Sequence, residues 1–173
     1  MNTLEAFSFS DYRSISHLAH GVKDGDRSTI IRAASYMANI VSVIADRHCV
    51  IIPMPGRTGV ATYTKQIAEQ ISCLTGIPIA DTLRSRPHMP QYLRKKLYGN
   101  GSLSLMKFFS TGNLPADTTP ILIDNVLDTG TTAMSALTAL RCPAKMVVLG
   151  NTNNFYRYHY PISLYEPSSA LYC

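Results

Sequence analysis

The sequence has few cysteines and no long hydrophobic run, and these absences exclude several classes of protein. Its four cysteines are widely spaced and form no Cys-x-x-Cys pair, so neither a zinc ribbon nor a disulfide framework is indicated. No apolar run reaches the roughly 20 residues that a membrane span needs. The N-terminus also lacks the basic region and apolar core of a secretory signal. We therefore expect a soluble, cytoplasmic protein with no membrane partner.

The length and the charge of the chain narrow its class but leave its partner open. With 173 residues, the chain is long enough for one well-buried domain and too short for two ordinary ones, so we expect a single domain over residues 1–173. The net charge of +5 suits either nucleic acid or a substrate with several phosphates. Because no recognition-helix motif is present, nucleic acid is the least favoured partner.

Short apolar runs alternate with stretches of helical spacing, which predicts an α/β fold. Residues 1–47 are expected to form an N-terminal helical cover: a loose arm at 1–9, then helices at 10–20 and 28–46. Residues 48–150 are expected to form the core, with strands at 49–52, 77–81, 121–123 and 145–150 and helices at 60–74 and 132–140. This alternation implies right-handed crossovers and a mainly parallel twisted sheet flanked by helices, with ligands at the carboxyl ends of the strands.

The tail, residues 151–173, contains several tyrosines, at positions 156, 158, 160, 165 and 172. Tyrosine rings can stack on a nucleobase or on another subunit, and a place in the core is an equal alternative. A homodimer therefore stays open.

Residues 120–133 organise the chain, because a buried strand there leads through a polar turn into a helix. The apolar run Ile121–Ile123 ends at Asp124, and a segment of small and apolar residues with helical spacing begins at Thr132. The turn therefore lies at a helix N-terminus, where free N–H groups and the helix dipole favour an anion.

The residue types of this turn suit a phosphorylated sugar. The turn combines two acids with four small residues: Asp124, Asp128, Thr129, Gly130, Thr131 and Thr132. Gly130 permits close backbone approach, the threonines offer hydroxyl groups, and the acids can accept from ribose hydroxyls or assist Mg²⁺. An ordinary strand-to-helix turn with one capping residue is the alternative.

A second anion site is expected after the strand at 49–52. The loop Pro53–Gly59 is rich in proline and glycine, so its backbone amides can turn toward a ligand, with Pro55 and Gly56 at its centre. Arg57 supplies a bidentate donor for phosphate. A structural turn with a solvated arginine is the alternative.

The most basic part of the chain, residues 83–96, follows the strand at 77–81. It contains Arg84 and Arg86, and Arg94, Lys95 and Lys96 come later. A flexible lid over residues 85–112 would exclude water and bring positive charge to the site. A solvated basic surface is the alternative.

The stretch 121–132 resembles the phosphoribosyl-pyrophosphate (PRPP) motif of type I phosphoribosyltransferases. It departs at Asn125, where that family usually has a second acid. The loop at 53–59 matches the family's pyrophosphate loop, including the Pro-x-Pro of the competence-protein-F-like branch, and the basic segment is similar to that branch's lid. The resemblance covers roughly residues 12–150, and this chain lacks the branch's N-terminal zinc-binding cysteines.

The resemblance implies Mg²⁺-dependent transfer of a 5-phosphoribosyl group from PRPP to a nitrogen nucleophile, either a nucleobase or an amine, with release of pyrophosphate. It assigns catalytic roles to Asp124 and Asp128, with Asp124 also holding the metal ion. Implied substrate-binding residues are Asn125, Thr129, Gly130, Thr131, Thr132, Pro55, Gly56, Arg57, Arg84 and Arg86. Because an amide at 125 removes a charge, reduced turnover is expected, and a PRPP- or nucleotide-binding regulator is the alternative.

Overall fold

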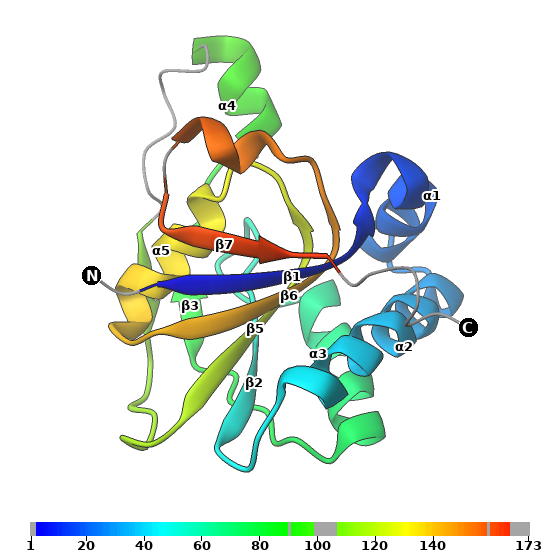
Figure 1. Cartoon of the computed structure of the whole chain (residues 1–173). Helices are drawn as coiled ribbons and strands as arrows, with labels where there is room; N and C mark the ends of the chain where they lie inside the picture. Colours follow the sequence, from blue (N-terminus) through cyan, green and yellow to red (C-terminus); the bar gives the residue numbers. More distant parts are fainter. Residues whose placement is uncertain (1–2, 90, 99–106, 159, 167–173) are drawn as a thin grey trace.

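The computed structural model describes residues 3–89, 91–98, 107–158 and 160–166 (Figure 1). The strands are β1 (Leu4–Asp11), β2 (Cys49–Pro53), β3 (Leu83–Ser85), β4 (Phe108–Ser110), β5 (Thr119–Leu127), β6 (Ala144–Asn151) and β7 (Ile162–Tyr165). The helices are α1 (Tyr12–Lys23), α2 (Arg27–Ile44), α3 (Tyr63–Thr75), α4 (Gln91–Tyr98), α5 (Thr131–Leu140) and the short 3₁₀ helix η2 (Asn154–Tyr158).

Five of the strands form one parallel sheet in the order β2-β5-β6-β1-β7. The segment after α3 adds only an isolated bridge, between Ile79 and Ile51, at the β2 edge. β3 and β4 pair separately as a small antiparallel ribbon. The expected mainly parallel sheet flanked by helices is therefore confirmed.

Helices cover both faces of the sheet, so its central strands are apolar on both sides. On one face α1, α2 and α3 pack against Ile121, Ile123 and Val147. On the other face α5 packs against Leu122 and Met146. Figure 1 shows the first three helices together on one side and α5 on the other. Alternate residues of β5 and β6 thus supply two separate cores.

The N-terminal residues correct the expectation of a loose arm within a purely helical cover. Leu4–Asp11 is a strand inside the sheet, paired with β6 on one side and β7 on the other. Leu4 and Ala6 are completely buried. The alternation of the segment Leu4–Ser10 was the available signal, and its serines concealed it: buried Ser8 satisfies its hydroxyl by donating to the Ser10 carbonyl at 2.8 Å.

The tail is likewise part of the fold up to residue 166. β7 pairs in parallel with β1, and Tyr165 stacks on Phe7 with ring centroids 5.1 Å apart. Phe155 and Ile162 are buried in the core beneath α5. Tyr156 is exposed, and residue 172 lies outside the described residues. The core residues of the tail are therefore Phe155 and Ile162, while Tyr165 is exposed and Tyr160 is only partly buried against the core.

Helix α1 ends later than the sequence indicates. A stop at Gly21 was expected, but the helix continues to Lys23. A Cβ atom at Gly21 would lie 2.7 Å from Thr29 Cγ2, so this glycine allows α1 and α2 to approach closely. Helix α3 begins at Tyr63 and ends as expected at Gly76, whose φ of 74° suits glycine.

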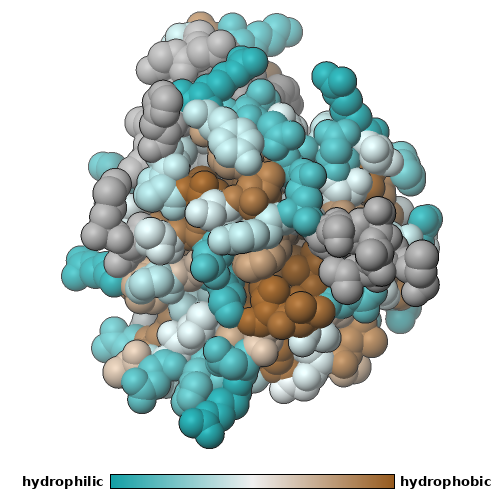
Figure 2. Space-filling model, viewed as in Figure 1, coloured by the Kyte–Doolittle hydropathy of each residue, from teal (hydrophilic) through white to brown (hydrophobic). Residues whose placement is uncertain are grey.

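The surface mixes polar and apolar side chains. Figure 2 shows apolar side chains gathered near the middle of the viewed face, with hydrophilic ones around them. Between β1 and α2, Phe9 stacks on Tyr36 with ring centroids 4.2 Å apart. Among the described residues, no helix is long and apolar enough to cross a membrane.

Candidate functional site

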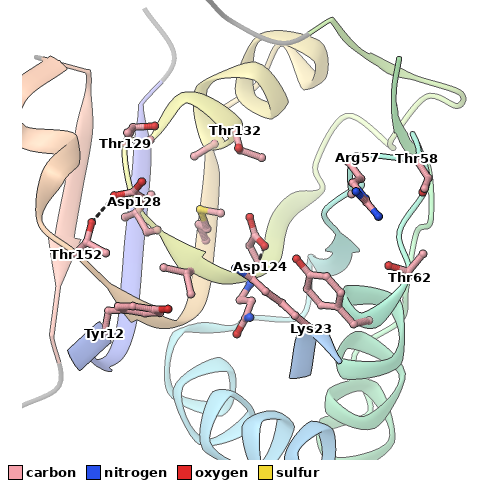
Figure 3. A pocket seen from close by; sticks show the side chains of 18 residues that line it. Tyr12, Lys23, Arg57, Thr58, Thr62, Asp124, Asp128, Thr129, Thr132 and Thr152 are labelled. Atoms are coloured by element: carbon pink, nitrogen blue, oxygen red, sulfur yellow. Dashed lines mark hydrogen bonds between the residues drawn. The ribbon is translucent and has the colours of Figure 1, made fainter. Parts of the chain in front are cut away.

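A cavity of about 820 Å³ lies at the carboxyl ends of β2 and β5 (Figure 3). The helices that follow these neighbouring strands pack on opposite faces of the sheet, α3 on one and α5 on the other. Such a switch point leaves a crevice where open α/β sheets bind ligands. The cavity is lined by Tyr12, Lys23, Gly56, Arg57, Thr58, Thr62, Tyr63, Asp124, Asn125, Val126, Leu127, Asp128, Thr129, Gly130, Thr132, Ala133, Met146 and Thr152.

Strand β5 carries two adjacent residues of the motif, Asp124 and Asn125. The strand was expected to stop at Asp124. It continues to Leu127 instead, because its backbone stays paired with β6. Burial raises the pKa of the Asp124 carboxyl to about 6, although the Asn125 N–H bond at 2.7 Å and the charge of Lys23 both act to lower it. Asp124 therefore changes its protonation state near neutral pH.

The structure corrects the expectation that Asn125 binds the ribose. Asn125 is only 1% exposed, and its side-chain amide donates to the Ala19 carbonyl of α1 at 2.9 Å. Its Oδ1 atom is buried and has no hydrogen-bond partner among the described residues. Successive strand residues point to opposite faces, so the side chain that follows Asp124 turns toward the helices. Asn125 thus lines the cavity while its side-chain amide is bonded to α1.

Asp128 is held by the segment that follows β6. Its Oδ1 atom accepts from Thr152 Oγ1 at 2.6 Å and from Asn154 Nδ2 at 2.7 Å. Figure 3 shows the bond to Thr152 at the edge of the cavity. Asp128 lines the cavity as the motif predicts, but both partners come from the tail, whose contribution the sequence did not reveal.

The threonines of the turn divide into two groups. Thr129 and Thr131 are buried and their hydroxyl oxygens lie 3.0 Å apart, so each satisfies the other. Thr131 does not line the cavity, which corrects its expected contact with substrate. Thr132 and the first turn of α5 do face the cavity, where helix N–H groups without intrahelical partners are available to an anion.

Gly130 is required for a reason other than ligand approach. Its φ is 77°, and a Cβ atom there would lie 2.8 Å from Ile162 Cδ1 and 3.2 Å from a ring atom of Tyr160. The tail therefore approaches Gly130 closely, while the expected approach of a ligand to this residue, which also lines the cavity, stays a prediction. A larger residue at 130 would disturb packing as well as any ligand, so it is a poor test of phosphate binding.

The opposite wall is the loop after β2, where Arg57 and Thr58 are exposed to the cavity. Two of the amides expected to bind an anion are used within the loop: Gly56 N–H donates to the Val60 carbonyl at 2.9 Å and Gly59 N–H to the Gly56 carbonyl at 3.0 Å. Any backbone contribution thus falls to the amides of Arg57 and Thr58. Pro55 is buried and does not line the cavity, which corrects its expected role.

Arg84 and Arg86 also fall outside the cavity lining. The Arg84 guanidinium group pairs with the Asp81 carboxylate at 2.7 Å, so its charge is already matched. Arg86 is exposed and does not line the cavity, and its N–H donates to the Lys107 carbonyl at 3.1 Å. The structure therefore does not bring either arginine into the cavity lining, and their expected contact with substrate stays a prediction.

The predicted lid begins against the loop after β2. Ser85 donates through its N–H to the Gly59 carbonyl at 3.0 Å, and the His88 N–H donates to the Arg57 carbonyl at 3.1 Å. The predicted lid covers residues 85–112, and residues 90 and 99–106 of it lie outside the described residues. Its flexibility stays a prediction.

Several residues of the cavity were not identified from the sequence. Lys23 and Tyr12 come from α1, and Tyr63 comes from the first turn of α3. Burial, with the Asp124 charge nearby, raises the pKa of the Tyr63 phenol, which keeps it protonated as a hydrogen-bond donor. None of these residues belongs to the central motif, so only the packing of α1 and α3 on the sheet could reveal them.

The described residues contain no group of three or more His, Cys, Asp or Glu side chains that could hold a metal ion. Mg²⁺ rarely needs such a group, because it keeps several waters and is bound by one or two carboxylates together with substrate phosphates. Asp124 and Asp128 at one cavity wall fit that pattern.

Comparison with known proteins finds a likeness to solved structures. No protein-family model matches the chain, and no curated protein matches it. Among solved structures, the orotate phosphoribosyltransferase from Aeropyrum pernix matches with a TM-score of 0.46 and 19% identity, over 85% of this chain and 76% of that chain. A likeness of this degree assigns neither an activity nor a substrate.

Proposed function

We propose that the chain is a phosphoribosyltransferase that binds PRPP with Mg²⁺ in this cavity and transfers the 5-phosphoribosyl group to a nitrogen nucleophile. The observation that carries this proposal is the arrangement of the walls. The N-terminus of α5 with Thr132 lies on one side, Arg57 on the other, and Asp124 between them (Figure 3). Two anion sites separated by carboxylates suit a sugar with a phosphate at each end.

The 5-phosphate is assigned to the turn before α5. The first N–H groups of that helix and the Thr132 hydroxyl can donate to phosphate oxygens, and the helix dipole favours their negative charge. The pyrophosphate is then placed on the opposite wall, where Arg57 and the Thr58 hydroxyl can stabilise the charge that grows as it leaves.

In the proposed reaction, the bond between the anomeric carbon and the pyrophosphate oxygen breaks while a bond to the acceptor nitrogen forms. The acceptor loses a proton, and Asp124 is the better base for it, because its pKa of about 6 lies near the working pH. Asp128, whose Oδ1 already accepts two hydrogen bonds, is better suited to orienting the ribose hydroxyls. Bound Mg²⁺ would neutralise phosphate charge, with Asp128 and the substrate phosphates as its ligands, which leaves Asp124 available to accept the proton.

Calorimetry with PRPP, with and without Mg²⁺, tests the proposal directly, together with pyrophosphate release measured with a panel of nucleobases and amines. We expect Mg²⁺-dependent binding and release with at least one acceptor. Failure to bind PRPP under any Mg²⁺ condition would reject the proposed function.

A PRPP- or nucleotide-binding regulator is the second candidate. It is favoured by Asn125, a buried amide at the position where the family motif usually has a second carboxylate, so this cavity has one carboxylate fewer. Binding of PRPP without pyrophosphate release across the panel would select this candidate. Membership of the competence-protein-F-like branch belongs to the same proposal and rests on the loop at 53–59 and the basic segment, and the panel of acceptors is needed to identify the nitrogen nucleophile.

Replacing Thr132 with valine is expected to weaken PRPP binding by roughly 10- to 150-fold, because one hydrogen bond to a charged group contributes about 1.5 to 3 kcal/mol. Thr138→Val is the matched control: it removes a hydroxyl from the same helix, one that bonds the Met134 carbonyl on an exposed face. Calorimetry on both variants makes the comparison. Equal affinities would remove the 5-phosphate from the α5 turn.

A further inference from the structure

The side chain of Asn125 joins two elements that the motif alone does not connect. Its amide, on β5, donates to the carbonyl of Ala19, on α1, at 2.9 Å. The contact links residues 106 positions apart and is buried. A buried amide whose Oδ1 has no partner among the described residues costs stability, so its retention calls for a role other than packing.

The carbonyl that accepts this bond belongs to the turn that carries Lys23. Ala19 precedes Lys23 by four residues, which is one helical turn. Lys23 ends α1 and reaches into the cavity, where Figure 3 shows it beside Asp124. The following turn is bonded within itself, with Asp24 N–H on the His20 carbonyl and Asp26 N–H on the Gly21 carbonyl, so it moves together with Lys23.

We propose that Asn125 is a positioning residue, which holds the last turn of α1 against β5 and thereby keeps the Lys23 ammonium group in the cavity beside Asp124. A carboxylate could not do this, because it has no hydrogen to donate to a carbonyl. It would also add a second negative charge next to Asp124 in a buried place. The amide at 125 is then a requirement of this cavity and not the loss of a catalytic acid.

The ligand-binding consequence rests on the proposed function, since Lys23 would act on the phosphates of PRPP. A double-mutant cycle tests it, with Lys23→Met, Asn125→Ala and the double variant, by calorimetry with PRPP and Mg²⁺. If Asn125 acts through Lys23, each single variant loses about tenfold in affinity and the double variant loses no more than Lys23→Met alone. An additive loss of about a hundredfold, or an unchanged affinity in either single variant, would overturn the proposal.

Two further variants distinguish the loss of the hydrogen-bond donor at position 125 from the loss of side-chain volume there. Asn125→Asp keeps the shape but lacks the donor, so it should lose affinity at least as strongly as Asn125→Ala. Ser8→Ala is the control, because it removes another buried bond to a backbone carbonyl, within β1 and outside the cavity lining. Affinity in Asn125→Asp equal to wild type would overturn the proposal.

Hydrogen exchange without ligand tests whether Asn125 holds the last turn of α1 against β5, and this test does not depend on what the ligand is. In Asn125→Ala, the amides of Asp24, Gly25 and Asp26 should exchange about tenfold faster than in wild type, while those inside α2 keep their rates. Unchanged rates at these three amides overturn the proposal. If wild type binds no PRPP but these amides respond, the proposed function fails and the positioning contact stands.

Discussion

Replacing Gly59 with alanine is expected to destabilise the protein by about 3 kcal/mol, measured as the free energy of unfolding in urea. Gly59 has a φ of 97°, where a side chain is strained, and a Cβ atom there would lie 2.5 Å from the Ser85 carbonyl oxygen. That oxygen cannot move cheaply, because Ser85 also donates its N–H to the Gly59 carbonyl and pairs within the ribbon of β3 and β4. Strain and clash therefore add.

Gly76→Ala is the matched control for Gly59→Ala. Gly76 has a similar φ of 74°, but no atom of the described residues lies within 4 Å of the position that its Cβ atom would take, so only the strain of about 1 kcal/mol applies. The difference between the two variants measures the contact with Ser85. A smaller effect for Gly59→Ala than for Gly76→Ala would mean that the loop does not dock on β3 as described. Loosening this loop should also weaken PRPP binding, because Arg57 lies on it.

Asp124→Asn is expected to stabilise the protein at pH 7 by about 1 to 2 kcal/mol and, under the proposed function, to abolish most transfer activity. Burial raises the pKa of Asp124 from 3.8 to about 6, so the charged carboxylate is disfavoured in the folded state. A shift of that size corresponds to about 3 kcal/mol at most, and partial exposure of the side chain reduces it. Acids that are needed for function often lower the folding stability of a protein in this way.

The pH dependence of this effect has a defined sign. Between pH 3.8 and about 6, the folded state holds more protons on Asp124 than the unfolded state does, so this residue's contribution to stability is full below 3.8 and is lost as pH rises through 6. The stability difference between Asp124→Asn and wild type should therefore grow from about pH 4 to about pH 6 and then stay level. Urea unfolding at several pH values measures it, and a difference that does not vary with pH would contradict the raised pKa.

Three residues of the central motif that line the cavity depart from local rules. Asp124 is a partly buried acid with a raised pKa, Asn125 keeps an oxygen with no partner among the described residues, and Gly130 takes a left-handed conformation against the tail. Local violations of this kind are expected where function outweighs stability.

The amino-acid sequence by itself determined the class of fold and the central turn. Apolar runs at 49–52, 121–123 and 145–150 are local signals for buried strands, and the small residues from Thr132 onward are a local signal for a helix. Each of these features depends on neighbours in the chain. Pattern alone was therefore enough to place a polar turn at the carboxyl end of a parallel strand.

Only the tertiary structure decided which side chains face the cavity. The pairing of β1 between β6 and β7 depends on residues more than 130 positions apart, and the fixing of α1 beside the cavity likewise depends on distant segments. Three side-chain contacts of the cavity also depend on distant segments. They are Lys23 beside Asp124, the bonds from Thr152 and Asn154 to Asp128, and the bond from Asn125 to the Ala19 carbonyl. These contacts join segments that no local periodicity relates, because whether a polar side chain meets a ligand or a buried carbonyl depends on which element packs against it.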